Sequence, residues 1–104
     1  MSLNEQQRAA TRDELGSNLA LSGQSVADVA AALGLSSASV QSALDVADAQ
    51  PQDVWLVRDY LNTVIRSNGA TPLPYSSLTE SMRAAAQRWF SLANVDDVIK
   101  RAKP

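Results

Sequence analysis

The stretch from Val26 to Leu44, VADVAAALGLSSASVQSAL, constrains the fold of this chain more than any other segment. Apolar residues recur at helical spacing on both sides of Gly34, and glycine can end a helix in a left-handed conformation without steric strain. Ser25 and Ser36, which precede the two apolar segments, are typical N-cap residues. The pattern therefore predicts two short amphipathic helices that meet at a tight turn, as in a helix-turn-helix.

A longer helix is expected before this motif. Ser2 and Glu5 have the spacing of a capping box, which predicts a helix from about residue 3 to about residue 21. Gly16 weakens its middle, so two helical pieces are an alternative. The Ser22-Gly23 pair is expected to end it.

A second long helix is expected after the motif, from Gln52 to Asn68. Pro51 suits the first position of a helix, and Asn68-Gly69 is a strong stop signal. Trp55 lies outside the apolar stripe of this helix, so we expect the helix to be central or covered by another segment. The stripe consists of Val54, Val57, Leu61, Val64 and Ile65.

The remainder of the chain predicts a connector and one more long helix. Two prolines within residues 70–77 require an extended connector. Ser77 and Glu80 then have capping-box spacing, so the last helix is expected to begin near residue 78. Asn94 is expected to interrupt it and leave a short basic tail to residue 104. The apolar residues of the helix, spaced by four and three, are Leu78, Met82, Ala85, Trp89 and Leu92.

This last stripe has two interpretations. Its spacing matches a coiled-coil seam, so it could form a homodimer through the C-terminal helix. It could equally fold back onto the helix at 52–68 of the same chain. Arg83 and Arg88 are expected on a solvated face, and Trp55 and Trp89 are expected in the core, where indole burial contributes most to packing.

Together these patterns predict an all-α fold of about five helices in a single domain spanning residues 1–104. Residues 3–69 form a helix-turn-helix core with flanking helices, residues 70–77 the connector, and residues 78–104 a C-terminal amphipathic helix with its tail. The chain has no Cys and no His, which removes thiolate nucleophiles, the commonest general base and the commonest zinc ligands. We therefore expect no enzyme activity, no catalytic residue, no cofactor and no metal.

The charges are distributed unevenly along the chain. Residues 1–57 carry two cations and seven carboxylates, and no Lys or Arg occurs from Asp13 through Val57. Residues 58–104 carry seven cations and four carboxylates. A DNA-binding protein normally needs cations near its reading helix, because phosphate neutralisation supplies much of the affinity. The motif thus favours DNA binding, whereas the charge distribution argues against strong binding.

Two functions follow from these opposing signals. The first is transcription-regulator-like binding of double-stranded DNA, in which Gln can read adenine and Ser can contact bases or phosphates. The second is a protein-interaction module without DNA binding, which presents an acidic, serine-rich face to a basic partner. The expected DNA-binding residues are Ser36, Ser37, Ser39, Gln41 and Ser42 on the second motif helix, with Arg58 and Arg66 from the following helix.

Two resemblances accompany these patterns. The motif with its flanking helices resembles the lambda-repressor-like class of DNA-binding domains. The whole chain resembles a small bacterial family of uncharacterised proteins, a domain of unknown function, which implies a helical, helix-turn-helix-like cytoplasmic protein but no activity or site residue. This resemblance rests on MSLNEQQRAATRDEL, DVWLVRDYLNTVI, TPLPYSSLTE and RAAAQRWF.

The apolar runs and the first residues of the sequence indicate where in the cell the protein is expected. No run approaches the roughly 18 apolar residues needed to span a bilayer, so no membrane association is expected. The first residues, MSLNEQQRAATRDE, lack the basic start and apolar stretch of a signal peptide. A cytoplasmic location is the expectation.

Overall fold

The computed structural model describes residues 3–47, 49–89 and 94–102, and these residues form six helices and no strand. The all-α prediction is therefore confirmed for the described residues, with one helix more than expected. The helices are α1 (Glu5–Ser22), α2 (Val26–Leu33), α3 (Ser37–Asp45), α4 (Pro51–Ser67), α5 (Glu80–Trp89) and α6 (Val95–Ala102).

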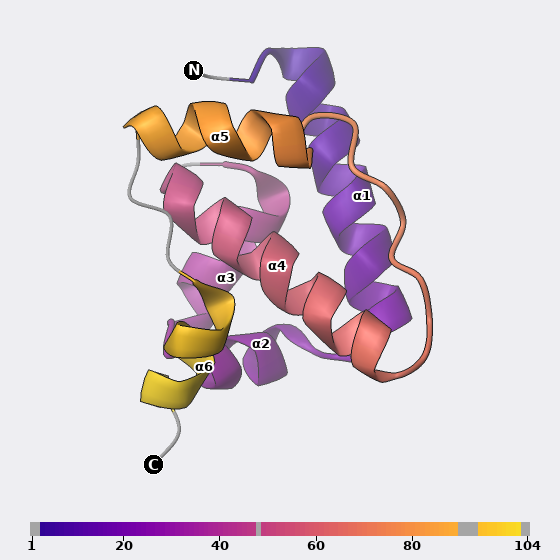
Figure 1. Ribbon diagram of the computed structural model, residues 1–104, viewed down its shortest axis with the longest axis vertical. Helices are drawn as coiled ribbons and strands as arrows, with labels where there is room; N and C mark the ends of the chain where they lie inside the picture. Colours follow the sequence, from indigo (N-terminus) through magenta and orange to yellow (C-terminus); the bar gives the residue numbers. More distant parts are fainter. Residues whose placement is uncertain (1–2, 48, 90–93, 103–104) are drawn as a thin grey trace.

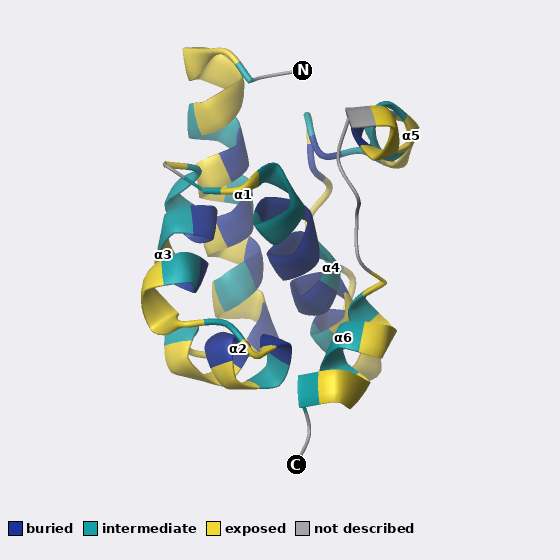
Figure 2. Cartoon of the chain, turned by 90° about the vertical axis from the view of Figure 1, so that its left-hand side faces the viewer, coloured by how far each residue is buried: buried dark blue, intermediate teal, exposed yellow. Residues whose placement is uncertain are grey.

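Helix α4 lies at the centre of the molecule. Helices α1, α3 and α6 pack against it, and α5 crosses above its first turns (Figures 1 and 2). Because neighbours surround it, α4 buries residues on almost every side, from Val54 to Ile65, and Trp55 is only 6% exposed. The predictions that this helix is covered and that Trp55 belongs to the core are confirmed. The side chain of Trp89 lies outside the described residues.

Helix α1 is continuous through Gly16, so the alternative of two pieces is wrong. It begins at Glu5, where Asn4 and Gln7 form a reciprocal capping box with bonds of 2.8 and 3.0 Å. The expected cap at Ser2 lies outside the described residues. Gly23 ends the helix in the left-handed conformation, with φ of 73°.

The segment between α4 and α5 runs along the outside of α1 (Figure 1). The buried side chain of Asn18 holds this segment in place through two hydrogen bonds with the Leu73 backbone. The Asn18 amide nitrogen donates to the Leu73 carbonyl at 3.1 Å, and the Leu73 N–H donates to the Asn18 amide oxygen at 2.8 Å. One turn earlier on α1, Glu14 accepts hydrogen bonds from the Ser76 N–H and hydroxyl at 3.2 and 2.8 Å. The extended connector is thus attached to α1 at two points.

Helix α5 begins later than expected. The Met82 N–H bonds to the Thr79 hydroxyl at 3.3 Å, so Thr79 caps the helix rather than Ser77, and Leu78 precedes the first turn. Leu78 and Ala86 are nevertheless buried in the common core. This contact favours the folded-back interpretation of the C-terminal stripe over a dimer seam.

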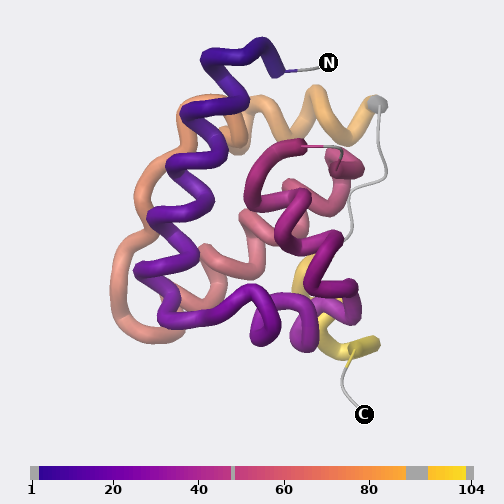
Figure 3. The backbone as a smooth tube through the Cα atoms, turned by 180° about the vertical axis from the view of Figure 1, so that it is seen from behind, coloured from indigo at the N-terminus to yellow at the C-terminus, as the bar shows by residue number. Residues whose placement is uncertain are grey.

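Helix α6 occupies the segment that was expected to be a basic tail. Asn94 accepts hydrogen bonds from the N–H groups of Asp96 and Asp97 at 2.9 and 3.3 Å, which starts a new helix. Its apolar face packs on α2 and α4, beside the turn after α2 (Figure 3). No helix among residues 3–47, 49–89 and 94–102 is long and apolar enough to cross a membrane.

Candidate functional site

Helices α2 and α3 are two short helices in contact with each other, on either side of Gly34, where the sequence predicts two short helices. Ser25 and Asp28 make a reciprocal capping box at the start of α2, with bonds of 3.0 and 3.1 Å. The bond that the Ser25 N–H donates to the Asp28 carboxylate lowers the pKa of this carboxyl, and the nearby Ser25 hydroxyl adds a smaller effect in the same direction. At the other end, Gly34 is left-handed with φ of 68°, and the Leu35 N–H bonds back to the Ala30 carbonyl at 3.0 Å. The turn is therefore fixed by local chemistry.

Helix α3 has one buried and one exposed face. Val40, Ala43 and Leu44 are at most 5% exposed and pack into the core, whereas Ser37 and Gln41 face solvent. Figure 2 shows the same division between buried and exposed residues along the helix. The outward face is thus polar and short, which is the kind of surface that can enter a groove or meet a partner.

The structure brings five of the predicted DNA-binding residues together on α3, and some of their polar groups are already bonded. Ser36 caps the helix: its hydroxyl accepts from the Ser39 N–H at 3.0 Å and donates to the Ser39 hydroxyl at 2.9 Å. The Gln41 amide donates to the Asp45 carboxylate at 3.1 Å. Ser37 is exposed and Ser42 is half-buried.

Arg58 lies apart from these serines, in the interior. Its side chain is only 10% exposed, its Nε donates to the Leu78 carbonyl at 3.2 Å, and its Nη1 pairs with Asp59 at 2.8 Å. The guanidinium also lies 5.5 Å from the Trp55 ring and 5.2 Å from the Tyr75 ring. A side chain engaged in this way supports the fold and does not lie on the α3 surface.

Arg66 is exposed, but it lies on the last turn of α4, next to the connector. Figures 1 and 3 place this end of α4 beside α1, on the opposite side of the molecule from α3. The two arginines expected to assist α3 are therefore not beside it.

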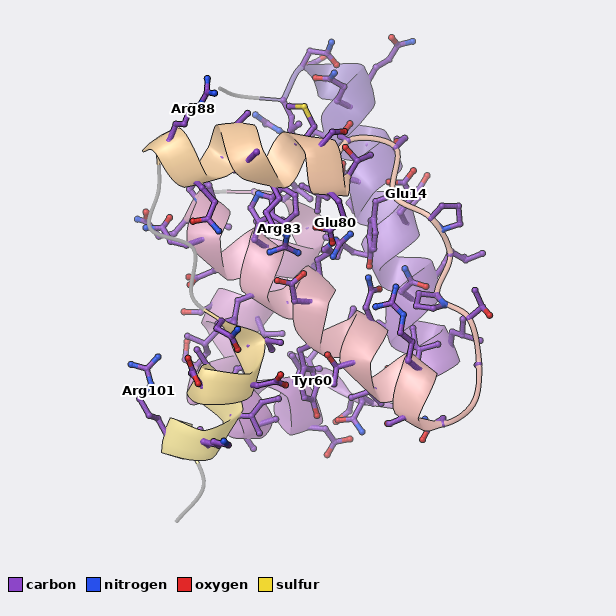
Figure 4. The ribbon with its side chains drawn as sticks, in the orientation of Figure 1. Glu14, Tyr60, Glu80, Arg83, Arg88 and Arg101 are labelled. Carbon is purple, nitrogen blue, oxygen red and sulfur yellow. The ribbon has the colours of Figure 1, made fainter. Side chains whose placement is uncertain are left out.

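Arg83 joins Arg58 in a charged junction between α4 and α5, which we define as Arg58, Asp59, Glu80 and Arg83. The Arg83 guanidinium donates to both Asp59 oxygens, at 3.0 and 2.6 Å, and to Glu80 at 2.7 Å. It also lies 4.9 Å from the Trp55 ring. Arg83 and Glu80 accordingly lie between the two helices in Figure 4, whereas Arg88 points away. The expectation that Arg83 belongs to a solvated face is wrong.

The pKa shifts at this junction follow from its hydrogen bonds. The bond from Arg83 lowers the pKa of the Glu80 carboxyl, and the positive charges of Arg83 and Arg58 add to the effect. The bond to Asp59 raises the pKa of Arg83 in turn. Burial raises the pKa of the neighbouring Tyr75 hydroxyl, an effect that the nearby Asn18 amide and the charge of Arg58 partly offset.

Helix α6 brings two cations close to the α2–α3 turn. A Cβ atom placed on Gly34 would lie 3.4 Å from the Ala102 Cβ, so the end of α6 touches this turn. Lys100 and Arg101, in the same last turn, are exposed, and Figure 4 shows Arg101 pointing outward. Sequence reasoning missed this helix, although its apolar spacing (Val95, Val98, Ile99 and Ala102) and its Asn94 cap were visible.

The geometry defines an all-helical protein, over its described residues, with a paired-helix surface and a separate charged junction. Those residues contain no group of three or more acidic side chains placed to hold a metal ion. The chain belongs to a bacterial family described as "Uncharacterized protein conserved in bacteria (DUF2316)", whose model matches residues 1–91. Neither the curated proteins nor the solved structures contain a match. Helix α6 lies beyond the residues that the family model matches.

Proposed function

We propose that the protein binds double-stranded DNA as a transcription regulator, with α2, the Gly34 turn and α3 acting as a helix-turn-helix. The observation that carries this proposal is the two-faced α3: its apolar side is anchored in the core, and its serine-rich first turn is exposed. In proteins that use this motif, the N-terminal residues of the second helix contact base edges. Ser37 and Gln41 have suitable chemistry for such contacts.

Phosphate contacts are assigned to α6 instead of α4 in this proposal. Lys100 and Arg101 lie in the helical turn that touches Gly34, and Gly34 lies three residues before the start of α3. Arg58 is excluded because its guanidinium is buried and paired. With only these two described cations near α3, affinity should be modest and its salt dependence shallow, because each neutralised phosphate adds to the salt slope.

The test is binding of the full chain to a genomic fragment library at about 50 mM salt, followed by affinity measurements on an enriched fragment. Gln41→Ala should weaken binding about tenfold, whereas Gln87→Ala, an exposed glutamine on α5, should not change it. Replacing Lys100 and Arg101 by Gln should reduce the salt slope, and Arg88→Gln should leave it unchanged. If no fragment is enriched, the proposal is wrong.

A second candidate is a protein-interaction module that recognises a basic partner. It is favoured by the absence of cations from Asp13 through Val57 and by the Gln41 amide already being bonded to Asp45. A lysine-rich peptide library should then bind, and Asp28→Asn together with Asp45→Asn should weaken that binding. Retention of DNA without any bound peptide would reject this candidate in favour of the first.

A homodimer through the C-terminal helix remains a prediction. Leu78 and Ala86 are buried against the same chain, which leaves part of the proposed seam already used. If the half-buried remainder of the stripe forms the dimer contact, analytical ultracentrifugation should show a dimer of the full chain. Ala85→Glu should then convert this dimer to a monomer.

A further inference from the structure

A groove of about 360 Å³ lies between the second half of α4 and the connector that follows it. Its helical wall carries Arg58, Asn62 and Arg66, which are spaced by four residues and therefore share one face of α4. Its other wall includes Pro72, Leu73 and Tyr75 from the connector. The three polar residues of α4 thus line a concavity that the DNA-binding function proposed for α3 and α6 does not use.

Both walls of this groove are held in place. Asn18 binds the Leu73 backbone through two hydrogen bonds, and Glu14 binds Ser76 through two more. On the other side, the Arg58 Nε donates to the Leu78 carbonyl at 3.2 Å. The connector is therefore anchored to both long helices, so a ligand would not have to order it on binding. Preformed walls of this kind reduce the entropic cost of binding.

The polar groups of the groove are incompletely satisfied. Asn62 is 5% exposed and Tyr75 8% exposed, yet the Asn62 Oδ1 and the Tyr75 hydroxyl have no hydrogen-bond partner among the described residues. Buried polar atoms without partners are uncommon, since each has lost its hydrogen bonds to water without replacement. Arg66, at the rim, is exposed, and no described carboxylate lies within ion-pair distance of it.

These unmet requirements define the chemistry of a ligand. The Arg66 guanidinium offers donors to an anion and can hold a carboxylate in a bidentate fashion. The Asn62 Oδ1 can only accept, so it requires an N–H or O–H donor. Pro72 and Leu73 supply apolar surface for a short side chain. We propose that this groove binds a small organic carboxylate that also carries an N–H or O–H donor, as α-amino and α-hydroxy acids do.

Sets of matched compounds test each part of this requirement. L-Leucine and L-phenylalanine carry both groups. Their amides lack the carboxylate, and 4-methylpentanoate and 3-phenylpropanoate lack the amine. The corresponding α-hydroxy acids and inorganic phosphate complete the panel. Binding to the full chain is followed by two-dimensional NMR, with the side-chain amide of Asn62 and the backbone amides of Ala70, Thr71, Leu73 and Tyr75 as reporters.

At least one amino or hydroxy acid should shift these resonances with a Kd below about 10 mM, and its amide and deaminated analogues should bind at least tenfold more weakly. Arg66→Gln should weaken binding at least tenfold while the spectrum stays that of a folded protein. Arg88→Gln removes an exposed arginine of α5 and should leave the Kd unchanged. Asn62→Ala should abolish the preference for the acid over its deaminated analogue.

Three results would overturn the proposal. One is the absence of any shift at 10 mM for all compounds. Another is equal affinity for the deaminated acids or for phosphate, which would indicate a simple anion site without a role for Asn62. The third is a Kd that Arg66→Gln does not change. None of these measurements involves DNA, so the proposal stands or fails separately from the function of α3.

Discussion

The α2–α3 pair and the charged junction between α4 and α5 are stabilised by opposite kinds of interaction. In the pair, Val29, Val40 and Ala43 are fully buried, and the side-chain hydrogen bonds lie at the helix ends and on the exposed face. At the junction, two arginines and two carboxylates form a network over an aromatic ring. Apolar burial contributes roughly in proportion to area, whereas a partly buried charge depends on its partner. The two regions should therefore respond differently to small substitutions.

Truncation in the apolar pair should have the largest effect. Leu33 is 3% exposed, so Leu33→Ala leaves a cavity and should lower the free energy of unfolding by about 3 kcal/mol. Leu21 is 45% exposed on α1, and Leu21→Ala is the matched control, with an expected loss below about 1 kcal/mol. Urea unfolding followed by circular dichroism measures both. Equal losses would mean that the pair is not a cooperative part of the core.

Removal of one charge at the junction should have the second largest effect on the free energy of unfolding. Asp59 accepts hydrogen bonds from both Arg58 and Arg83, so Asp59→Asn leaves two close cations with only Glu80 to neutralise them. We expect a loss of about 2 kcal/mol in unfolding free energy, less than for a fully buried pair because Glu80 remains.

Asp13→Asn is the matched control for this change, because Asp13 is exposed on α1 and should contribute little. A loss for Asp59→Asn as small as that for Asp13→Asn would show that the junction is held by the apolar contacts of Leu78 and Ala86 and not by its charges.

Two glycines offer a comparison of smaller size within the first half of the chain. Gly34 has φ of 68° and faces Ala102, so Gly34→Ala should destabilise the protein by about 1 kcal/mol. Gly16 lies within α1 with nothing near its missing Cβ, so Gly16→Ala should stabilise it by up to about 1 kcal/mol. Thermal unfolding should move the melting temperature in opposite directions for the two variants. Movement in the same direction would contradict the assigned role of Gly34.

The same contrast explains which features could be predicted from the sequence. The caps at Ser25 and Ser36 and the left-handed Gly34 were predicted correctly, because each depends on residues within four positions of it. The contact between Arg83 and Asp59 was not predicted, since the two residues lie 24 positions apart. Their contact depends on the path of the connector, which no local pattern specifies.

Two further features could have been recognised in the sequence. Helix α6 has an Asn94 cap, acidic residues in its first turn and basic residues in its last, which together are typical helix signals. The spacing of Arg58, Asn62 and Arg66 likewise places them on one face of a helix. That this face borders a groove could not be predicted, because the groove exists only where Asn18 and Glu14 attach the connector to α1.

The smallest expected effect distinguishes the two regions by their response to salt. Each contains a carboxyl group with a lowered pKa, Asp28 through its hydrogen bonds with Ser25 and Glu80 through Arg83. A lowered pKa means that folding favours the ionised form. For Glu80, the contribution of this ionised carboxylate to the free energy of unfolding is complete above the ordinary glutamate pKa of 4.5. It is lost as the pH falls through the lower pKa that Glu80 has in the folded state.

Since the Glu80 side chain is 70% exposed, Glu80→Gln should lower the free energy of unfolding by less than about 0.5 kcal/mol at neutral pH. It should also make the fall of stability with decreasing pH shallower.

NMR titration of the Asp28 and Glu80 carboxyls at low and high salt provides the sharper measurement. High salt should move the pKa of Glu80 toward its ordinary value, because its partners are the charges of Arg83 and Arg58. It should leave that of Asp28 nearly unchanged, because the partners of Asp28 are an uncharged N–H and a hydroxyl. A larger salt response at Asp28 than at Glu80 would contradict the conclusion that charges stabilise the junction and apolar burial stabilises the α2–α3 pair.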